Sequence, residues 1–197
     1  MSADTVQTWV VAAVILLALA AVAWLITREQ RRRQSLRLQQ RFGPEYSRVI
    51  AERGDRATAE TELLAREKRV ERLKLVSLSG EDAAKFGQAW GALQTQFVDN
   101  PQGAVLAADR LVRDLMVKRG YPMADFERRA ADISVDYPTV VDAYRSARAI
   151  AVRSQQGQAS TEELRKAVVH YRILFDELLE VRHPRQASGP NTEVVHT

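Results

Sequence analysis

Residues 160–179 read STEELRKAVVHYRILFDELL, and this stretch decides the class of fold. Ser160 followed by Glu163 three residues later is the sequence signature of a capping box at a helix N-terminus. The apolar residues that follow recur at helical spacing: Leu164, Val168, Tyr171, Phe175 and Leu178. Together these signals predict a long amphipathic helix that ends at His183-Pro184.

The hundred residues before this helix carry further helix starts and stops. Ser79 and Asn100-Pro101 are capping signals at the beginning of two predicted helices, and Gly120 is a stop for the second of them. We expect Tyr121-Pro122 to open a short helix and Asp136-Tyr137-Pro138 to open another. No stretch shows the alternation of apolar and polar residues that is typical of a strand.

Apolar residues within these predicted helices fall on single faces. They are Phe86, Trp90, Leu93 and Phe97, then Val105, Ala108, Val112, Leu115 and Met116, then Phe126, Ala130 and Ile133, and finally Val141, Tyr144, Ala147 and Ala151. The sequence therefore predicts an all-α fold in which residues 75–183 form a bundle of about five helices. The aromatic faces fit a packed core, although some of them could instead line a groove for a partner helix.

A second kind of helix is predicted near the N-terminus, where residues 9–26 read WVVAAVILLALAAVAWLI without a charge, Gly or Pro. With one more residue at each end, residues 8–27 would span about 30 Å, the thickness of a bilayer core. Trp9 and Trp24 lie near the two ends, where such rings prefer the membrane interface. We expect a single transmembrane helix over 8–27 after a short tail of residues 1–7. A cleaved signal peptide and a buried central helix are the alternatives.

Charge predicts how this helix would be oriented. Residues 28–74 hold 14 basic and 8 acidic residues, whereas residues 75–197 hold 15 and 16. Six arginines directly follow the apolar run: Arg28, Arg31, Arg32, Arg33, Arg37 and Arg41. The positive-inside rule then predicts a signal-anchored, single-pass protein of the cell inner membrane, with the N-terminus outside and the bulk of the chain in the cytoplasm. These arginines could also contact anionic membrane lipid, or they could serve only as topology determinants.

The segment of residues 28–74 is predicted to be a basic stalk and a charged helical arm. Residues 28–41 are good helix formers, so we expect the apolar helix to continue through them until Gly43-Pro44. A new helix is predicted from Glu45 to Lys74, with a possible kink at Gly54. Homo-oligomerisation through residues 45–74 is possible, and residues 184–197 are predicted to form a disordered tail.

The search for chemistry finds no site. The chain has no Cys, which excludes disulfides, thiolate zinc sites and cysteine nucleophiles, and it has no phosphate-binding loop, GxGxxG or HExxH motif. His170, His183 and His196 show no spacing for a metal pair. Asp109 and Asp114, like the acidic residues near the end of the chain, are interpreted as solvated surface, and Glu162 and Glu163 as first-turn residues. We predict no cofactor, no metal, no catalytic residue and no nucleic-acid binding.

Four stretches carry a resemblance to a group of proteins: Arg41 to Tyr46 (RFGPEY), Trp90 to Pro101 (WGALQTQFVDNP), Arg119 to Glu127 (RGYP with DFE) and Ser160 to Leu179. They resemble an uncharacterised bacterial family of membrane-anchored, all-helical proteins. The resemblance implies a shared helical fold over most of residues 41–180, and it carries no activity, ligand or catalytic residue with it.

The function predicted from the sequence is that of a membrane-anchored protein whose cytoplasmic helical domain binds an unknown protein partner or acts as a scaffold. Two alternatives come from other classes of function. The domain could bind a small ligand or act as an enzyme through a site that the motifs do not reveal. The Arg-rich stalk could make the protein a binder of anionic lipid surfaces.

Overall fold

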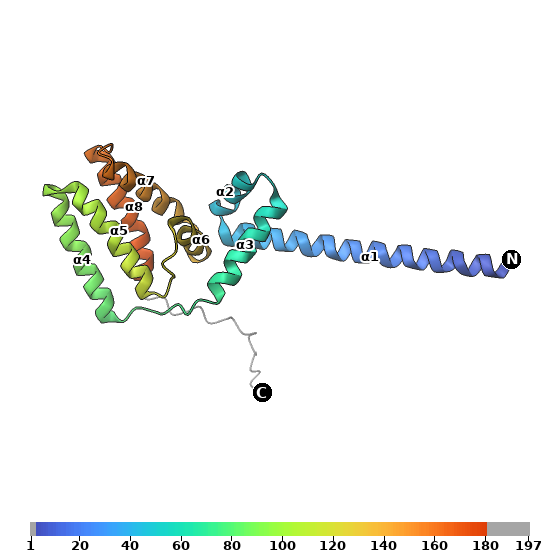
Figure 1. Cartoon of the computed structure of the whole chain (residues 1–197). Helices are drawn as coiled ribbons and strands as arrows, with labels where there is room; N and C mark the ends of the chain where they lie inside the picture. Colours follow the sequence, from blue (N-terminus) through green and yellow to red (C-terminus); the bar gives the residue numbers. More distant parts are fainter. Residues whose placement is uncertain (1–2, 181–197) are drawn as a thin grey trace, which may run out of the picture. The chain divides into compact units, whose positions relative to one another are not determined.

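A computed structural model describes the backbone of residues 3–180 and the side chains of residues 16, 17 and 19–180. All regular elements in this part of the chain are α-helices, which confirms the predicted all-α class (Figure 1). They are α1 (Ala3–Phe42), α2 (Pro44–Arg53), α3 (Arg56–Glu71), α4 (Gly80–Asp99), α5 (Pro101–Lys118), α6 (Phe126–Asp136), α7 (Val141–Gln155) and α8 (Thr161–Leu179). The chain divides within α3 into two compact units, residues 1–60 and 61–197.

The first unit begins with one uninterrupted helix. α1 has 40 residues, which at 1.5 Å per residue gives a length of about 60 Å. The predicted continuation of the apolar segment into the basic stalk is thus confirmed. α1 ends at Phe42 because Gly43 has a φ of +48° and is followed by Pro44, which occupies the first turn of α2.

The arm that was predicted as a single helix from Glu45 to Lys74 consists of two helices. α2 ends at Gly54, which has a left-handed φ of +71° and donates its N–H to the carbonyl of Ile50. Asp55 then starts α3, because its carboxylate accepts hydrogen bonds from the backbone N–H of Thr58 at 2.8 Å and from the hydroxyl of Thr58 at 2.7 Å. Gly54-Asp55 is therefore a stop followed by a start, rather than the predicted kink.

Side chains near the α2–α3 turn tie the two helices together within the first unit. The Tyr46 hydroxyl donates a 2.7 Å hydrogen bond to Glu60, and Arg56 donates one of 2.9 Å to the same oxygen. Tyr46 is buried. Burial, with the Glu60 carboxylate beside it, raises the pKa of the Tyr46 phenol, so it stays a hydrogen-bond donor at neutral pH.

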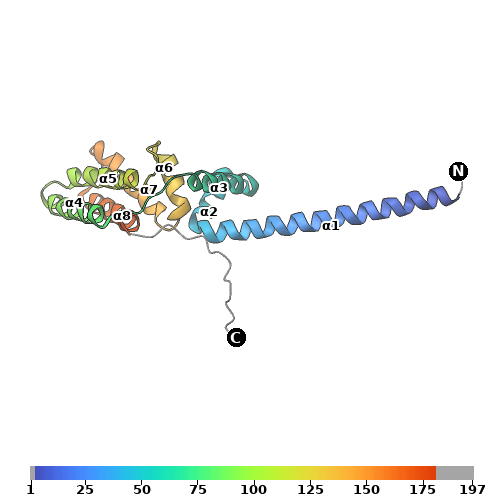
Figure 2. The ribbon, with the colours of Figure 1, turned by 90° about the horizontal axis from the view of Figure 1, so that it is seen from below.

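The second unit contains the bundle of five helices, α4 to α8. α5 packs against α4, α8 and α7, while α8 also packs against α7, and α6 packs against α7 (Figures 1 and 2). The predicted apolar faces meet in one core whose members include Trp90, Val112, Leu115, Tyr144 and Phe175. Phe86, Phe97, Phe126 and Val168 are only partly buried against that core. Most of the predicted core positions are thus confirmed.

Local hydrogen bonds fix the ends of the bundle helices where the sequence predicted them. The Ser79 hydroxyl accepts from the N–H of Asp82, and the Asn100 side chain accepts from the N–H of Gly103. Ser160 and Glu163 form the full capping box. Gly120 stops the chain after α5 with a φ of +91°, and a side chain there would place its Cβ 2.6 Å from the carbonyl oxygen of Lys74.

Two predicted helix starts in the bundle are wrong. Tyr121-Pro122 does not open a helix, because the first cap in this region is Asp125, whose carboxylate accepts from the N–H of Arg128 at 2.9 Å. Tyr121 is instead buried, and its hydroxyl donates to Asp136 at 2.7 Å. Asp136 is the last residue of α6, and α7 begins only at Val141. At the first of these positions the side chain of Asp125 provides the cap. α7 begins after Val140, which forms no side-chain cap hydrogen bond.

Two other predictions fall wholly or partly on residues outside the described range. The predicted helix end at His183-Pro184 and the disordered tail of residues 184–197 lie outside the described residues. Within the described residues, none of the helices combines the length and the apolar character needed to cross a membrane. The described residues thus lend no support to a transmembrane helix over residues 8–27, and the side chains of residues 8–15 and 18 lie outside the description.

Candidate functional site

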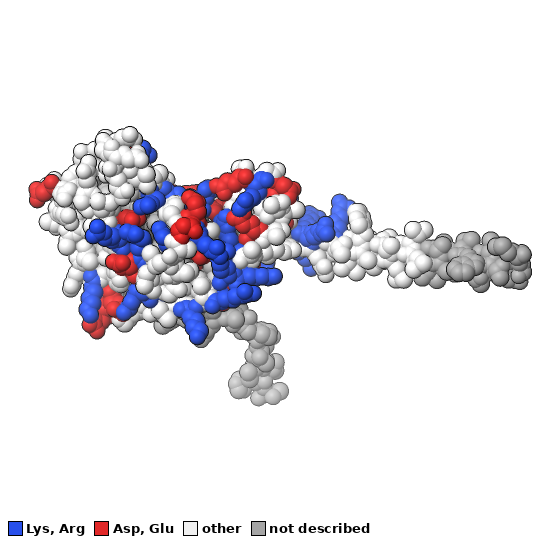
Figure 3. Space-filling view, viewed as in Figure 1, with Lys and Arg blue, Asp and Glu red and all other residues white. Residues whose placement is uncertain are grey.

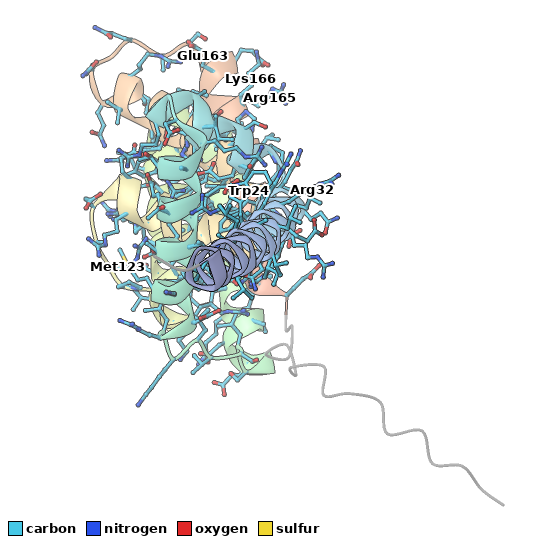
Figure 4. The ribbon with its side chains drawn as sticks, turned by 90° about the vertical axis from the view of Figure 1, so that its right-hand side faces the viewer. Trp24, Arg32, Met123, Glu163, Arg165 and Lys166 are labelled. Atoms are coloured by element: carbon cyan, nitrogen blue, oxygen red, sulfur yellow. The ribbon has the colours of Figure 1, made fainter. Side chains whose placement is uncertain are left out.

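The six arginines singled out in the sequence lie along the C-terminal half of α1. Arg28, Arg31, Arg32, Arg33 and Arg37 are exposed, and Arg41 is half-buried. Figure 4 looks along α1 and shows the labelled side chain of Arg32 projecting from the helix surface. The guanidinium of Arg28 lies 5.1 Å from the ring centroid of Trp24, and Arg33 donates a 2.8 Å hydrogen bond to Glu29. Their predicted contact with anionic lipid stays a prediction.

A buried carboxylate in the bundle provides a second candidate site. Asp109, on α5, is only 4% exposed, although the sequence analysis placed it on a solvated surface. Tyr171 of α8 donates its hydroxyl to Asp109 Oδ1 at 2.9 Å. The other oxygen, Oδ2, faces Arg113 Nη2 at 3.2 Å and Arg148 Nη1, from α7, at 3.6 Å. Three helices thus converge on one carboxylate.

Aromatic rings connect this carboxylate to a third arginine. The rings of Tyr144 and Tyr171 lie 6.3 Å apart, and the ring of Phe126 lies 5.0 Å from that of Tyr144. The Arg148 guanidinium is 5.9 Å from the centroid of Phe126. Arg129 of α6 donates a 3.4 Å hydrogen bond to the Tyr144 hydroxyl. We call Arg113, Arg129 and Arg148 the arginine cluster.

The electrostatics of this region keep its phenols neutral. Burial raises the pKa of Tyr171, and the negative charge of Asp109 raises it further. Burial also raises the pKa of Tyr144, although Arg129 acts in the opposite direction. Both hydroxyls therefore carry their protons at neutral pH and can only be neutral donors or acceptors. The arrangement holds guanidinium groups in place and supplies no nucleophile or base among these phenols.

The sequence contained one overlooked signal for Asp109. It lies four residues after Val105, which is a member of the buried stripe of α5, and it directly follows Ala108. Its spacing to Arg113 resembles an ordinary surface ion pair of the i,i+4 type. Its other partners, Arg148 and Tyr171, come from distant parts of the chain, so the local pattern could not reveal which groups surround this carboxylate.

The histidines form no metal site in the part of the chain that the structure describes. His170 is half-buried, and its Nδ1 is buried with no hydrogen-bond partner among the described atoms. No group of three or more His, Cys, Asp or Glu side chains within the described residues could hold a metal ion. His183 and His196 lie outside those residues.

The acidic residues of α8 have local roles. Glu163 accepts hydrogen bonds from the backbone N–H of Ser160 at 2.9 Å and from Arg153 at 2.6 Å, and these bonds lower its pKa to about 2. Glu162 pairs with Arg165 at 2.7 Å. Figure 4 shows Glu163, Arg165 and Lys166 gathered at the N-terminal end of α8. Asp176 pairs with Arg172 one turn away at 2.7 Å, as expected for a solvated face.

The aromatic faces contribute mainly to the core. Trp90 and Phe175 are fully buried with their ring centroids 4.6 Å apart, and Arg172 lies 5.3 Å from the centroid of Trp90. Between Lys85 and Asp99, α4 carries no charged residue, and the buried residues of this helix are Trp90 and Leu93. Figure 3 shows this face as a white surface between charges at the two ends of α4.

Comparisons with known proteins add no relative. No family model matches the chain, and no match is found among curated proteins or among solved structures. Function is therefore inferred from the residues of this chain alone.

Proposed function

We propose that this chain is a single-pass protein of the cell inner membrane whose helical bundle lies in the cytoplasm and binds a partner protein. The observation that carries the anchor is the exposure of large apolar side chains on α1. Leu17 is 72% exposed and Leu16 67%, and five further large apolar residues between them and the stalk are at least half exposed: Leu19, Val22, Trp24, Leu25 and Ile26.

Such a helix surface is unstable in water. Covering a Leu or Ile side chain stabilises a protein by about 1.5–3 kcal/mol relative to leaving it exposed. A helix that is apolar on all sides belongs in a membrane or in the core of a large protein, and the uncharged run of residues 9–26 has no polar side. Lipid is the covering that best fits this surface, and residues 9–26 have the length to span it.

The orientation follows from the residues at the end of the run. Trp24, with the Arg28 guanidinium 5.1 Å from its ring, is suited to the boundary between acyl chains and headgroups. The five exposed arginines from Arg28 to Arg37 then lie immediately beyond that boundary. Positive charge next to a membrane helix stays on the cytoplasmic side, which favours a cytoplasmic bundle.

Partner binding is proposed for the bundle because its helices are fixed in place by side-chain caps and by a single packed core. A rigid set of helices offers a surface that a partner can recognise without ordering it first. This role corresponds to the interaction or scaffold module that the sequence predicts.

Reporter fusions test the orientation. Alkaline phosphatase, which is active only outside the cytoplasm, is fused after residue 182, and a green fluorescent protein fusion at the same point serves as its complement. We expect the phosphatase fusion to be inactive and the green fluorescent protein fusion to be fluorescent. The matched control replaces Arg28, Arg31, Arg32 and Arg33 by Gln and adds lysines at positions 2, 4 and 7, which should invert both readouts. An active phosphatase on the native sequence contradicts the proposal.

Binding of anionic lipid by the stalk is a second candidate function, and the exposure of Arg28 to Arg37 favours it. Each basic residue near an anionic surface contributes about 1 kcal/mol at moderate salt. A shortened chain that begins at Arg28 should bind phosphatidylglycerol vesicles, and the triple change of Arg31, Arg32 and Arg33 to Gln should weaken this binding. Binding that is insensitive both to these changes and to salt would exclude the stalk as the lipid contact.

A further inference from the structure

The arginines of the bundle differ in how their charge is balanced. Arg153, Arg165 and Arg172 each face a carboxylate of their own: Glu163, Glu162 and Asp176. The arginine cluster of Arg113, Arg129 and Arg148 has only Asp109 among the described carboxylates within ion-pair distance. Arg113 and Arg148 share this one carboxylate, and no described carboxylate lies within ion-pair distance of Arg129, so the three guanidinium groups carry two more positive charges than Asp109 balances.

Each member of the arginine cluster is half-buried and is held by oxygen atoms of the bundle. Arg113 donates its Nε to the backbone carbonyl of Asp109 at 3.3 Å and directs Nη2 at the carboxylate of the same residue. Arg148 shares that carboxylate and lies over the Phe126 ring. Arg129 is held by the Tyr144 hydroxyl and by the backbone carbonyl of Ala124. Guanidinium groups fixed in this way have lost conformational freedom before any ligand arrives.

We infer that the arginine cluster is a docking site for a segment rich in Asp or Glu on the partner protein, an inference that rests on the proposed function. The guanidinium fork matches a carboxylate in two parallel hydrogen bonds, and a guanidinium has five N–H donors. Asp109 and the neighbouring oxygens engage only some of the donors of Arg113, Arg129 and Arg148. The remaining donors and the excess positive charge fit carboxylates that come from outside the chain.

The surroundings of the arginine cluster favour a protein segment over other anions. Phe126 is half-buried beside Arg148, and Met123, which is 49% exposed, directly precedes the residue whose carbonyl holds Arg129. Figure 4 shows Met123 on the outer side of the loop before α6. Aromatic residues, Met and Arg are the types enriched in protein interfaces. An acidic segment with apolar neighbours would use both kinds of contact.

A binding titration with a defined probe tests this inference. The full chain is reconstituted in nanodiscs of phosphatidylcholine and titrated with a fluorescein-labelled peptide of eight glutamates flanked by leucines. We expect the double variant Arg129→Gln with Arg148→Gln to weaken binding by about 10-fold or more, because it removes two groups that can make charge-assisted hydrogen bonds to the carboxylates of the peptide. The single variant Arg148→Lys, which keeps the charge and loses the fork, should also weaken binding. Thermal unfolding of each variant shows whether it is folded, and Arg148→Lys keeps the test decisive if the double variant does not fold.

Matched controls remove the same charge elsewhere. Arg165→Gln with Lys166→Gln takes two positive charges from the exposed side of α8, and Arg31→Gln with Arg32→Gln takes two from the stalk. Both double variants should bind the glutamate peptide nearly as well as the native chain. The same peptide with glutamines in place of glutamates should not bind. Equal weakening by either control, or binding of the glutamine peptide, would overturn the assignment.

Two further outcomes separate this inference from others. Binding of a phosphoserine peptide or of phosphatidylglycerol nanodiscs to the arginine cluster, without binding of the glutamate peptide, would refute the acidic protein segment as occupant. The reporter fusions decide the proposed function independently. An active phosphatase together with retained peptide binding refutes the cytoplasmic assignment and keeps the arginine site, whereas an inactive phosphatase without peptide binding refutes the arginine site alone.

Discussion

Two tryptophans, one on α1 and one on α4, differ greatly in how much of their side chain is exposed. Trp24 on α1 is 59% exposed, while Trp90 on α4 is 1% exposed. Each has an arginine guanidinium at a similar distance from its ring, 5.1 Å for Arg28 and 5.3 Å for Arg172. Both tryptophans thus have an arginine nearby, but Trp90 also packs against the ring of Phe175 and is buried.

The difference comes from the distribution of apolar residues around each helix. α4 has an apolar stripe on one side, so it can bury Trp90 against Phe175 while its opposite face stays in water. The run that contains Trp24 is apolar on every side, and one neighbouring helix could cover only part of it. An apolar stripe suits a helix that packs on a protein core, whereas a helix that is apolar on all sides belongs in a membrane or in the core of a large protein.

The largest expected effect is on the buried tryptophan. Trp90→Ala removes a fully buried ring from contact with Phe175, and we expect a loss of about 3–5 kcal/mol in the free energy of unfolding of the bundle. Urea unfolding of the full chain in detergent, followed by circular dichroism, measures this loss. Trp24→Ala is the matched control and should leave the unfolding transition of the bundle unchanged. Similar losses for both variants would break the contrast between the two regions.

A charged residue placed in the apolar run of α1 tests whether that run lies in lipid. Leu17 lies at the centre of the apolar run, where an Arg side chain costs about 2.5–3.5 kcal/mol in a membrane helix. We expect Leu17→Arg to move a large share of the protein out of the membrane fraction in fractionated cells while the thermal unfolding of the bundle is unaffected. Leu17→Ala should stay in the membrane fraction. Unchanged fractionation of Leu17→Arg would contradict a lipid environment for α1.

Removal of the Asp109 carboxylate probes polar burial in the bundle. In Asp109→Asn the hydroxyl of Tyr171 keeps an acceptor, but Arg113 and Arg148 lose their shared anion. The guanidinium groups are partly exposed, so we expect a loss of only about 1–3 kcal/mol in the free energy of unfolding. Asp114→Asn, an exposed position on the same helix, is the control and should change stability by less than about 0.5 kcal/mol.

The smallest effect is expected at the α8 capping box and depends on pH. Ser160→Ala should cost about 1 kcal/mol. The pKa of Glu163 is lowered from its usual 4.5 to about 2, so its contribution to stability is present above pH 4.5 and is lost as the pH falls towards 2. Glu163→Gln should flatten the pH dependence of the unfolding midpoint over that window. Glu127→Gln, on α6, should leave it unchanged, and a flattening of equal size there would argue against the capping box.

Much of the fold could be predicted because its signals are local. Ser79, Asn100 and Ser160 mark helix starts through hydrogen bonds that reach only three residues along the chain. One error arose where two local signals competed. The sequence predicted a helix start at Tyr121-Pro122, but the helix is capped by Asp125 instead. The candidate site was only half predictable. The stalk arginines are close together in the sequence, so the sequence alone singled them out. The residues of the arginine cluster come from three separate helices, α5, α6 and α7.

The sequence by itself determined the helical class, most helix ends and the apolar run of residues 9–26, because caps, periodicity and runs act over a few residues. Only the tertiary structure decided that Asp109 is buried beside Tyr171 and that Arg113 and Arg148 share its charge. The physical reason is that the environment of a carboxylate is set by helices that pack against it from distant parts of the chain. Burial and charge balance are properties of the assembled bundle, and no short stretch of residues encodes them alone.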